Sequence, residues 1–178
     1  YDTKIINKTL QEASENVEVS VPKNVVNKYK KEKPNNRIKR ILKELKNSIA
    51  LNDEISEYLQ IFVHQNSIEK WKVFLKGPDD SPYENKWWYL FVTFPDLYPL
   101  QPPDIRFVSI PYHLNVSSDG KICIDCISRN YDSDIPIVQI LKYIRQMLKD
   151  PNIELPIQTD SLLKYKQNKV LRKEYYEL

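Results

Sequence analysis

Glycine and cysteine are both scarce in this sequence. Among 178 residues there are two glycines, Gly77 and Gly120, and two cysteines, Cys123 and Cys126. The glycines lie too far apart to form the glycine-rich loops of dinucleotide-binding folds or of P-loop proteins, so both classes are excluded. Two cysteines cannot build a disulfide framework, and a single Cys-x-x-Cys pair is more typical of reducing compartments than of secreted scaffolds.

Long apolar runs are also missing. No run approaches the roughly 18 residues that a membrane-spanning helix needs, and no signal-peptide pattern opens the sequence. We therefore predict an intracellular protein of the cytoplasm or nucleus that binds no membrane. Because the sequence begins at Tyr1 and not at a methionine, it leaves open a targeting segment removed upstream and, with it, an organelle.

The remaining composition is that of one globular domain. Apolar residues make up 41% of the sequence and aromatic residues 11%, which is enough to fill a single core. The net charge is +3, but residues 28–46 alone carry +7, so the rest of the chain carries −4. A solvated basic helix face explains this segment more simply than a phosphate-binding patch does, and we predict no nucleic-acid partner.

Hydrophobic periodicity predicts an α+β fold. Residues 1–34 are polar and weakly periodic, so we predict an N-terminal extension there and a core domain over 35–178. From Arg37 the apolar residues Ile38 to Ile49 recur at helical spacing, with basic residues on the opposite face. Four runs with strand character then predict an antiparallel meander at 58–65, 68–76, 87–94 and 105–108. The third run is apolar on both faces, so we expect a central strand that is covered on each side.

A second amphipathic helix is predicted around residues 136–149. Pro136 suits the first turn, and the residues of its expected buried face are Ile137, Ile140, Leu141, Ile144, Met147 and Leu148. We expect the N-terminus to be capped by the side chain of Asp132, Ser133 or Asp134. Since proline cannot continue the helical hydrogen-bond ladder, residues 150–152 end the helix, and a last helix is expected over 159–176.

The irregular stretch 111–134 contains the residues able to carry chemistry, and three kinds of site were considered from the residues alone. A zinc site needs four ligands, which the sequence does not supply near the cysteines, so we predict no metal. A thiol oxidoreductase would use Cys123 and Cys126, but no helix begins directly after them to lower a thiol pKa. A nucleophilic Cys123 would use His113 and Asn115, although both side chains are also suited to bonding the loop backbone, the role we favour for His113 over that of a general base.

Four motifs, in this order, resemble those of the ubiquitin-conjugating enzymes. They are Lys-Gly-Pro-Asp-Asp-Ser-Pro-Tyr at 76–83, Tyr-Pro-Leu-Gln-Pro-Pro at 98–103, Tyr-His-Leu-Asn-Val at 112–116, and Gly-Lys-Ile-Cys-Ile-Asp at 120–125. The resemblance extends from about residue 37 to residue 178. It implies the fold of that family, with an N-terminal helix, a four-stranded antiparallel meander and C-terminal helices, which agrees with the periodicity.

The resemblance also implies an activity. A family member accepts ubiquitin or a ubiquitin-like modifier from an ATP-dependent activating enzyme as a thioester on its cysteine, here Cys123, and needs no cofactor. It then transfers the modifier to a lysine amine of a protein substrate, with a ubiquitin ligase as partner. Cys126 matches no functional position and is expected to pack as a small apolar side chain. The alternative is a catalytically silent relative that acts as a binding module.

Residues around the cysteine receive roles from the same resemblance. Asn115 matches the asparagine that either stabilises the oxyanion or holds the loop beside the thioester. His113 matches a histidine that is structural in the family. Gly120, Asp125 and Glu154 are expected to support the cysteine loop, with Glu154 as the nearest substitute for an acidic residue often found at the next position.

Two further surfaces are implied for partners. Lys39, Arg40 and Lys43 lie on the basic helix face that resembles the surface for the activating enzyme. Leu100 and Ser133 correspond to the surface that meets ligases. Here Leu100 stands where phenylalanine is common and residues 132–134 replace a Ser-Pro-Ala type loop, so an atypical ligase is expected.

The chain departs from the family motifs close to the cysteine. Leu114 replaces the proline of His-Pro-Asn, which removes a fixed φ from the loop that positions Asn115. Tyr131 stands where tryptophan is usual, and Leu155 stands at the position of the acidic residue. These departures are the reason for keeping the silent relative as an alternative.

Overall fold

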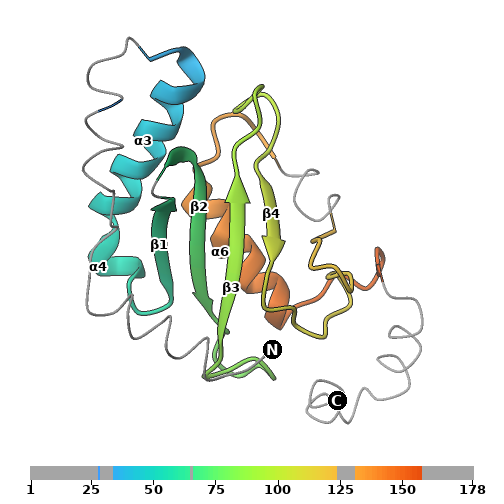
Figure 1. The fold of residues 1–178 in the computed structure, drawn as a ribbon. Coiled ribbons are helices and arrows are strands. Elements are labelled where there is room, and N and C mark those ends of the chain that lie inside the picture. Colours follow the sequence, from blue (N-terminus) through green and yellow to red (C-terminus); the bar gives the residue numbers. More distant parts are fainter. Residues whose placement is uncertain (1–27, 29–33, 65, 124–130, 158–178) are drawn as a thin grey trace.

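The computed structural model describes residues 28, 34–64, 66–123 and 131–157 (Figure 1). In chain order the elements are α3 (Asn36–Ala50), α4 (Asn52–Ile55), β1 (Leu59–His64), β2 (Ser67–Lys76), β3 (Trp87–Thr93), β4 (Asp104–Phe107) and α6 (Ile137–Lys149). Most of the predicted extension, the predicted last helix, Asp125 and Cys126 lie outside the described residues, so the predictions made for them stay predictions.

The four strands form one antiparallel sheet in the order β1-β2-β3-β4, which confirms the predicted meander. Helices α3 and α6 both contact β2 and also contact each other. Their apolar faces join the inward side chains of the sheet in a single cluster, and α6 crosses behind the strands in Figure 1. The protein is therefore an α+β domain whose main helices cover one face of the sheet.

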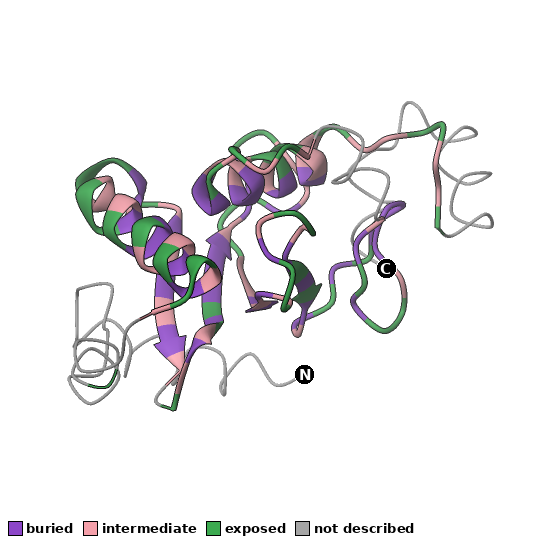
Figure 2. Cartoon of the chain, turned by 90° about the horizontal axis from the view of Figure 1, so that it is seen from above, coloured by how far each residue is buried: buried purple, intermediate pink, exposed green. Residues whose placement is uncertain are grey.

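Helix α3 begins as its sequence predicts. The side chain of Asn35 accepts a hydrogen bond from the Ile38 backbone N–H at 2.9 Å and so caps the first turn. Figure 2 shows the helix as a buried stripe and an exposed stripe. The prediction that Ile49 belongs to the buried stripe is wrong, because this side chain is 50% exposed. The helix ends one residue later, and Leu51 packs against the core instead.

Strand β3 is interior to the sheet, as predicted, but its two faces are not equally covered. Leu90 and Val92 are fully buried on the helix side. On the other side Phe74 packs on Phe62 and on Tyr89, with ring centroids 5.8 and 5.3 Å apart. The prediction of full cover on both faces is therefore wrong for β3, whose remaining residues are only half-buried. Both helices lie on the same side of the sheet, so aromatic rings shield one another on the opposite face.

The N-terminus of α6 is capped from another helix, not by residues 132–134. Pro136 is the N-cap residue and offers no side-chain hydrogen bond. The Ile137 backbone N–H instead donates to Oε2 of Glu44 in α3 at 3.0 Å. The Asp132 carboxylate accepts from the Asp134 backbone N–H at 3.1 Å, so it forms a local turn. The predicted local cap is thus wrong, because a carboxylate 93 residues away provides it.

Candidate active site around Cys123

Cys123 follows two isolated bridges that hold its segment against the core. Lys121 pairs with Arg106 of β4, and Ile122 pairs with Val116. The Cys123 backbone N–H then donates to the Asn115 carbonyl oxygen at 2.9 Å. The thiol is free and half-buried. These contacts bring the candidate nucleophile and the His-Leu-Asn motif together, as the sequence predicts for Cys123 and Asn115.

Gly120 makes the turn that leads into the cysteine segment. Its φ is +81°, in the left-handed region that favours glycine. Its N–H donates to the Ser117 carbonyl and its own carbonyl accepts from the Phe107 N–H, both at 2.9 Å. A Cβ atom at this position would lie 2.0 Å from the Phe107 carbonyl oxygen. Both the backbone conformation and the space therefore require glycine here.

His113 is buried and bonded to backbone through both ring nitrogens. Nδ1 accepts from the Asn115 backbone N–H at 3.0 Å, which assigns the proton to Nε2, and Nε2–H donates to the Met147 carbonyl at 2.9 Å. Burial lowers the pKa of His113 from 6.5 to about 4, although the bond to Met147 partly opposes this. The ring is therefore neutral at pH 7 and ties the motif to α6, and neither nitrogen is placed to act as a base toward Cys123.

This buried histidine predicts a pH dependence of stability. Between pH 6.5 and about 4 the unfolded chain binds a proton on His113 that the folded chain does not, so its contribution is retained above pH 6.5 and lost as pH falls toward 4. Between pH 7 and pH 4.5 we expect His113 to reduce the free energy of unfolding by about 2 kcal/mol. Urea denaturation of the wild type and of His113→Gln at both pH values measures this change in the free energy of unfolding. An equal loss in both proteins would contradict this assignment.

Asn115 clamps the loop that follows α6. Its side chain is fully buried, and Nδ2 donates to the carbonyl oxygens of Asn152 at 2.8 Å and of Leu155 at 3.1 Å. Its Oδ1 accepts from the Asn152 backbone N–H at 2.8 Å. Both amide hydrogens are used in this way. Of the two roles that the resemblance implies for Asn115, this geometry corresponds to holding the loop.

Leu114 compensates for the missing proline by burial and by a tertiary hydrogen bond. Its side chain is fully buried, and its carbonyl oxygen accepts from the Ile157 backbone N–H at 2.8 Å. In the same loop the Glu154 backbone N–H donates to Oδ1 of Asn152 at 2.9 Å, while the Glu154 side chain is exposed. The His-Leu-Asn motif thus keeps its position without the fixed φ of a proline. Leu155 stands where an acidic residue was expected from the resemblance, so this position of the loop offers no carboxylate.

An open groove of about 910 Å³ runs beside Cys123. Its apolar lining includes Pro102, Pro103, Ile105 and Ile122. Prolines and branched apolar side chains cannot hydrogen-bond water, so a chain lying in this groove would be partly desolvated next to the thiol. The groove was not predicted from the sequence, because β4 and the cysteine segment form it only when they lie side by side.

Two charged pairs border the groove. Arg106 Nε lies 3.0 Å from Oδ2 of Asp104, and Lys121 Nζ lies 2.9 Å from Oδ2 of Asp119. A hydrogen bond from the Ser117 hydroxyl and the contact with Lys121 lower the pKa of Asp119 to about 2. No role for these charges was predicted from the sequence. Their only signal in the sequence is that Asp119 and Lys121 lie within four residues of Cys123.

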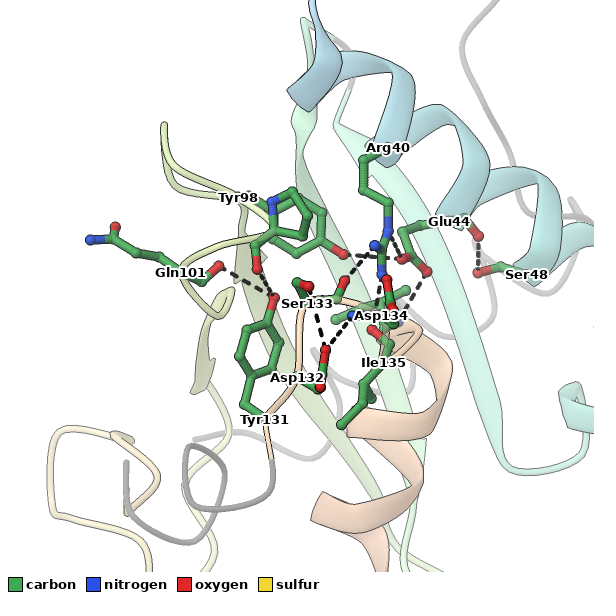
Figure 3. A network of polar contacts seen from close by, with 12 residues as sticks. Arg40, Glu44, Ser48, Tyr98, Gln101, Tyr131, Asp132, Ser133, Asp134 and Ile135 are labelled. Atoms are coloured by element: carbon green, nitrogen blue, oxygen red, sulfur yellow. Dashed lines mark hydrogen bonds and ion pairs between the residues drawn. The ribbon is translucent and has the colours of Figure 1, made fainter.

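A second polar cluster joins α3 to the segment before α6 (Figure 3). Glu44 is 2% exposed, and its Oε1 accepts from Arg40 Nε at 2.6 Å and from the Tyr98 hydroxyl at 3.1 Å. Arg40 also donates to the carbonyl oxygens of Ser133 and Ile135. The prediction that Arg40 shares the exposed basic face is therefore wrong, because its guanidinium is turned inward by Glu44. The buried polar roles of Glu44 and Tyr98 were not predicted from the sequence.

The two predicted partner surfaces are placed differently. Lys39 and Lys43 are exposed on α3. Leu100 is 79% exposed, whereas Ser133 is half-buried. Tyr131 joins the segment that contains Ser133 to the loop that contains Leu100. Its hydroxyl donates to the Pro99 carbonyl at 2.6 Å and lies 3.4 Å from the Gln101 carbonyl (Figure 3).

Within the described ranges, no group of three or more His, Cys, Asp or Glu side chains is arranged to hold a metal ion. None of the helices in these ranges has the length and apolar character needed to cross a bilayer.

Known proteins resemble this chain in sequence and in structure. Residues 40–177 match the family model described as ubiquitin-conjugating enzyme. The chain is 33% identical over 107 residues to the "Probable bifunctional E2/E3 enzyme R795" of Acanthamoeba polyphaga mimivirus, covering 60% of this chain and 8% of that protein. It is 30% identical over 106 residues to "Ubiquitin-conjugating enzyme E2 2" of Candida albicans, covering 60% and 59%.

A solved structure agrees with these matches. The crystal structure described as "a putative ubiquitin conjugating enzyme from Plasmodium yoelii" is similar with a TM-score of 0.70 and 28% sequence identity, over 82% of this chain and 96% of that one. The match spans less than two thirds of the length of either curated relative. The family model nevertheless covers most of the chain, including the cysteine segment, the groove and the clamped loop. The protein therefore belongs to the ubiquitin-conjugating enzyme family.

Proposed function

We propose that this protein accepts ubiquitin or a ubiquitin-like modifier from an activating enzyme as a thioester on Cys123 and transfers it to a lysine amine of a protein substrate. The observation that carries the proposal is a half-buried free thiol beside an open, apolar groove in a member of this family. A thiol shielded on one side and open on the other is able to hold an acyl group while an acceptor approaches.

Loading of the cysteine needs little assistance from the protein. Attack of a thiol on a thioester needs only a small fraction of thiolate. That fraction is sufficient when the acyl donor is itself an activated thioester, because one thiolate then replaces another. The proposal therefore requires no histidine base, in agreement with the bonding of both ring nitrogens of His113 to backbone atoms.

Transfer to lysine is the more demanding step. At a reference pKa near 10.4, about one lysine in 2,500 is neutral at pH 7, a handicap of roughly 4 to 5 kcal/mol. Desolvation lowers an amine pKa, and the apolar lining contributed by Pro102, Pro103 and Ile105 offers such surroundings next to Cys123. The amine then attacks the thioester carbonyl, the carbon–sulfur bond breaks, Cys123 leaves as thiolate, and the new amide nitrogen loses a proton to solvent.

We assign Asn115 a positioning role in this reaction. Its two amide hydrogens are donated to Asn152 and Leu155, so the clamped loop and the cysteine segment are attached to the same residue, through its side chain and through its carbonyl oxygen. The relative position of the clamped loop and the cysteine segment therefore depends on Asn115, although its side chain need not contact the reacting atoms. Glu154 is exposed at the outer part of this loop and supports its turn through its backbone N–H.

The partner surfaces follow from exposure and charge. Lys39 and Lys43 are exposed basic residues on one helix face and are proposed to meet the activating enzyme. Leu100 presents an exposed apolar side chain and is proposed to meet a ligase. Arg40 and Ser133 support these surfaces from within, because the guanidinium of Arg40 donates to the Ser133 carbonyl.

The loading reaction tests the proposal. The purified chain is mixed with an activating enzyme, ATP and its cognate modifier, for several such pairs, and resolved on non-reducing and reducing gels. We expect one pair to give an adduct that thiol reagents remove, and Cys123→Ala to abolish it. The matched control is Cys126→Ser, which is expected to load as the wild type does and would lose function if both cysteines formed a redox pair.

An adduct that persists in Cys123→Ala would refute the assignment of the nucleophile. Absence of an adduct with every pair, in a folded protein, would instead support the catalytically silent relative.

A further inference from the structure

Lys121 and Cys123 project from the same side of one extended segment. Along residues 121–123 the burial is exposed, buried and half-buried, and Ile122 points into the core. The bridges to Arg106 and Val116 keep Lys121 and Ile122 extended. Side chains two residues apart in extended backbone leave the same face about 6.6 Å apart, a span that a lysine side chain covers. Both Lys121 and Cys123 accordingly line the groove.

Among the described residues, Asp119 holds the Lys121 ammonium. Its Nζ lies 2.9 Å from Oδ2 of Asp119, and both side chains are more than half exposed, at 58% and 54%. The Ser117 hydroxyl donates to Oδ1 of Asp119 at 2.5 Å, so the carboxylate remains ionised and oriented. Ion pairs between exposed side chains are weak. Lys121 is therefore restrained near Asp119 without being fixed there.

We propose that Lys121 is an internal acceptor for the modifier carried by Cys123, and that Asp119 restrains it. This inference rests on the proposed function of Cys123. In the step itself the neutral Lys121 amine attacks the thioester carbonyl and the carbon–sulfur bond breaks. Cys123 departs as thiolate and the nitrogen gives its extra proton to solvent, so the modifier ends on Lys121 as an amide. No oxidant or further reactant is needed.

Proximity favours this reaction when the groove is empty. Among the described residues that line the groove, Lys121 is the only lysine. A nucleophile tethered two residues from the reacting sulfur acts at a high effective concentration, whereas a substrate lysine must first bind. The protein therefore needs a device that limits self-transfer, and Asp119 supplies one. The ion pair holds Nζ beside Asp119, on the side of Lys121 that lies away from Cys123 along the chain.

Single-turnover chases of the full chain test the inference. Cys123 is loaded, activation is stopped by chelating the magnesium, and no substrate is added. We expect the thiol-sensitive adduct to convert into a thiol-resistant one, which mass spectrometry of tryptic peptides maps to Lys121. Lys121→Arg should load to the wild-type extent and form little of the resistant adduct. Asp119→Asn should speed conversion by up to about fivefold, the change expected from losing one exposed ion pair.

The groove offers a matched control. Asp104→Asn removes a carboxylate that borders the same groove but pairs with Arg106, and it should leave the conversion rate unchanged. A resistant adduct at another lysine that forms equally in Lys121→Arg would overturn the acceptor assignment, as would hydrolysis of the thioester without any amide product. An unchanged rate in Asp119→Asn would overturn the restraint. Absence of a thiol-sensitive adduct would overturn the proposed function as well, so the failures are distinguishable.

Discussion

Replacing Glu44 with alanine is expected to lower the free energy of unfolding by about 3 to 5 kcal/mol. The carboxylate is buried and accepts from Arg40, from the Tyr98 hydroxyl and from the Ile137 backbone N–H. Alanine would leave a partly buried guanidinium without its counter-charge and the first N–H of α6 without an acceptor. Because these donors come from three separate segments, the damage spreads beyond α3.

Urea denaturation at pH 7 measures this loss. Glu44→Gln retains one carbonyl oxygen but presents an amide to donors, so it is expected to recover only part of the stability. The matched control is Glu54→Ala, which removes an exposed glutamate paired with Lys142 and should change stability by less than about 1 kcal/mol. A loss below about 1 kcal/mol in Glu44→Ala would show that the buried carboxylate does not hold these segments together.

Replacing Gly120 with valine is expected to destabilise the fold by about 3 to 5 kcal/mol and to disturb the cysteine segment. The position has a φ of +81°, and a Cβ atom would lie 2.0 Å from the Phe107 carbonyl oxygen. To relieve the clash, the chain must give up the bond from the Phe107 N–H to the Gly120 carbonyl. Since Phe107 is buried at the end of β4, the unpaired N–H adds to the strain.

Two measurements separate stability from function in this variant. Denaturation gives the free energy of unfolding, and loading of Cys123 at a temperature where the variant remains folded reports on the thiol. We expect both to fall. The control is Ser118→Val, an exposed neighbour in the same turn, with an expected change within about 0.5 kcal/mol. A Gly120→Val protein that is as stable as the control would contradict the requirement for glycine.

The sequence predicted the regular elements well because their signals are local. The helix from Arg37 and the helix ended by residues 150–152 each carry an apolar stripe at helical spacing, and both are found. Each strand of the meander carries its own run of apolar residues, so its limits are recovered to within one residue. Gly120 and the His-Leu-Asn motif were identified for the same reason, since their neighbours along the chain were sufficient.

Errors arose where one segment depends on another. The position of Arg40 along the helix predicts an exposed side chain. The buried Glu44 carboxylate instead turns the Arg40 guanidinium inward. The cap of α6 was expected from residues 132–134, yet it comes from a carboxylate far away in the chain. Periodicity also does not tell which face of β3 a helix covers.

By itself the sequence determined which residues form the elements and which motif surrounds Cys123, because periodicity and motif spacing act over a few residues. Only the tertiary structure decided what Glu44, Asn115 and Lys121 do. The side-chain partners of Glu44 and Asn115 that come from other segments lie between 37 and 93 residues away and are selected by packing, which brings α3 to α6 and Asn115 to the loop after α6. Asp119 is two residues from Lys121, but the bridge to β4 that holds this segment beside the groove is a tertiary contact. The buried carboxylate, the clamped loop and the lysine beside the thiol all arise in this way.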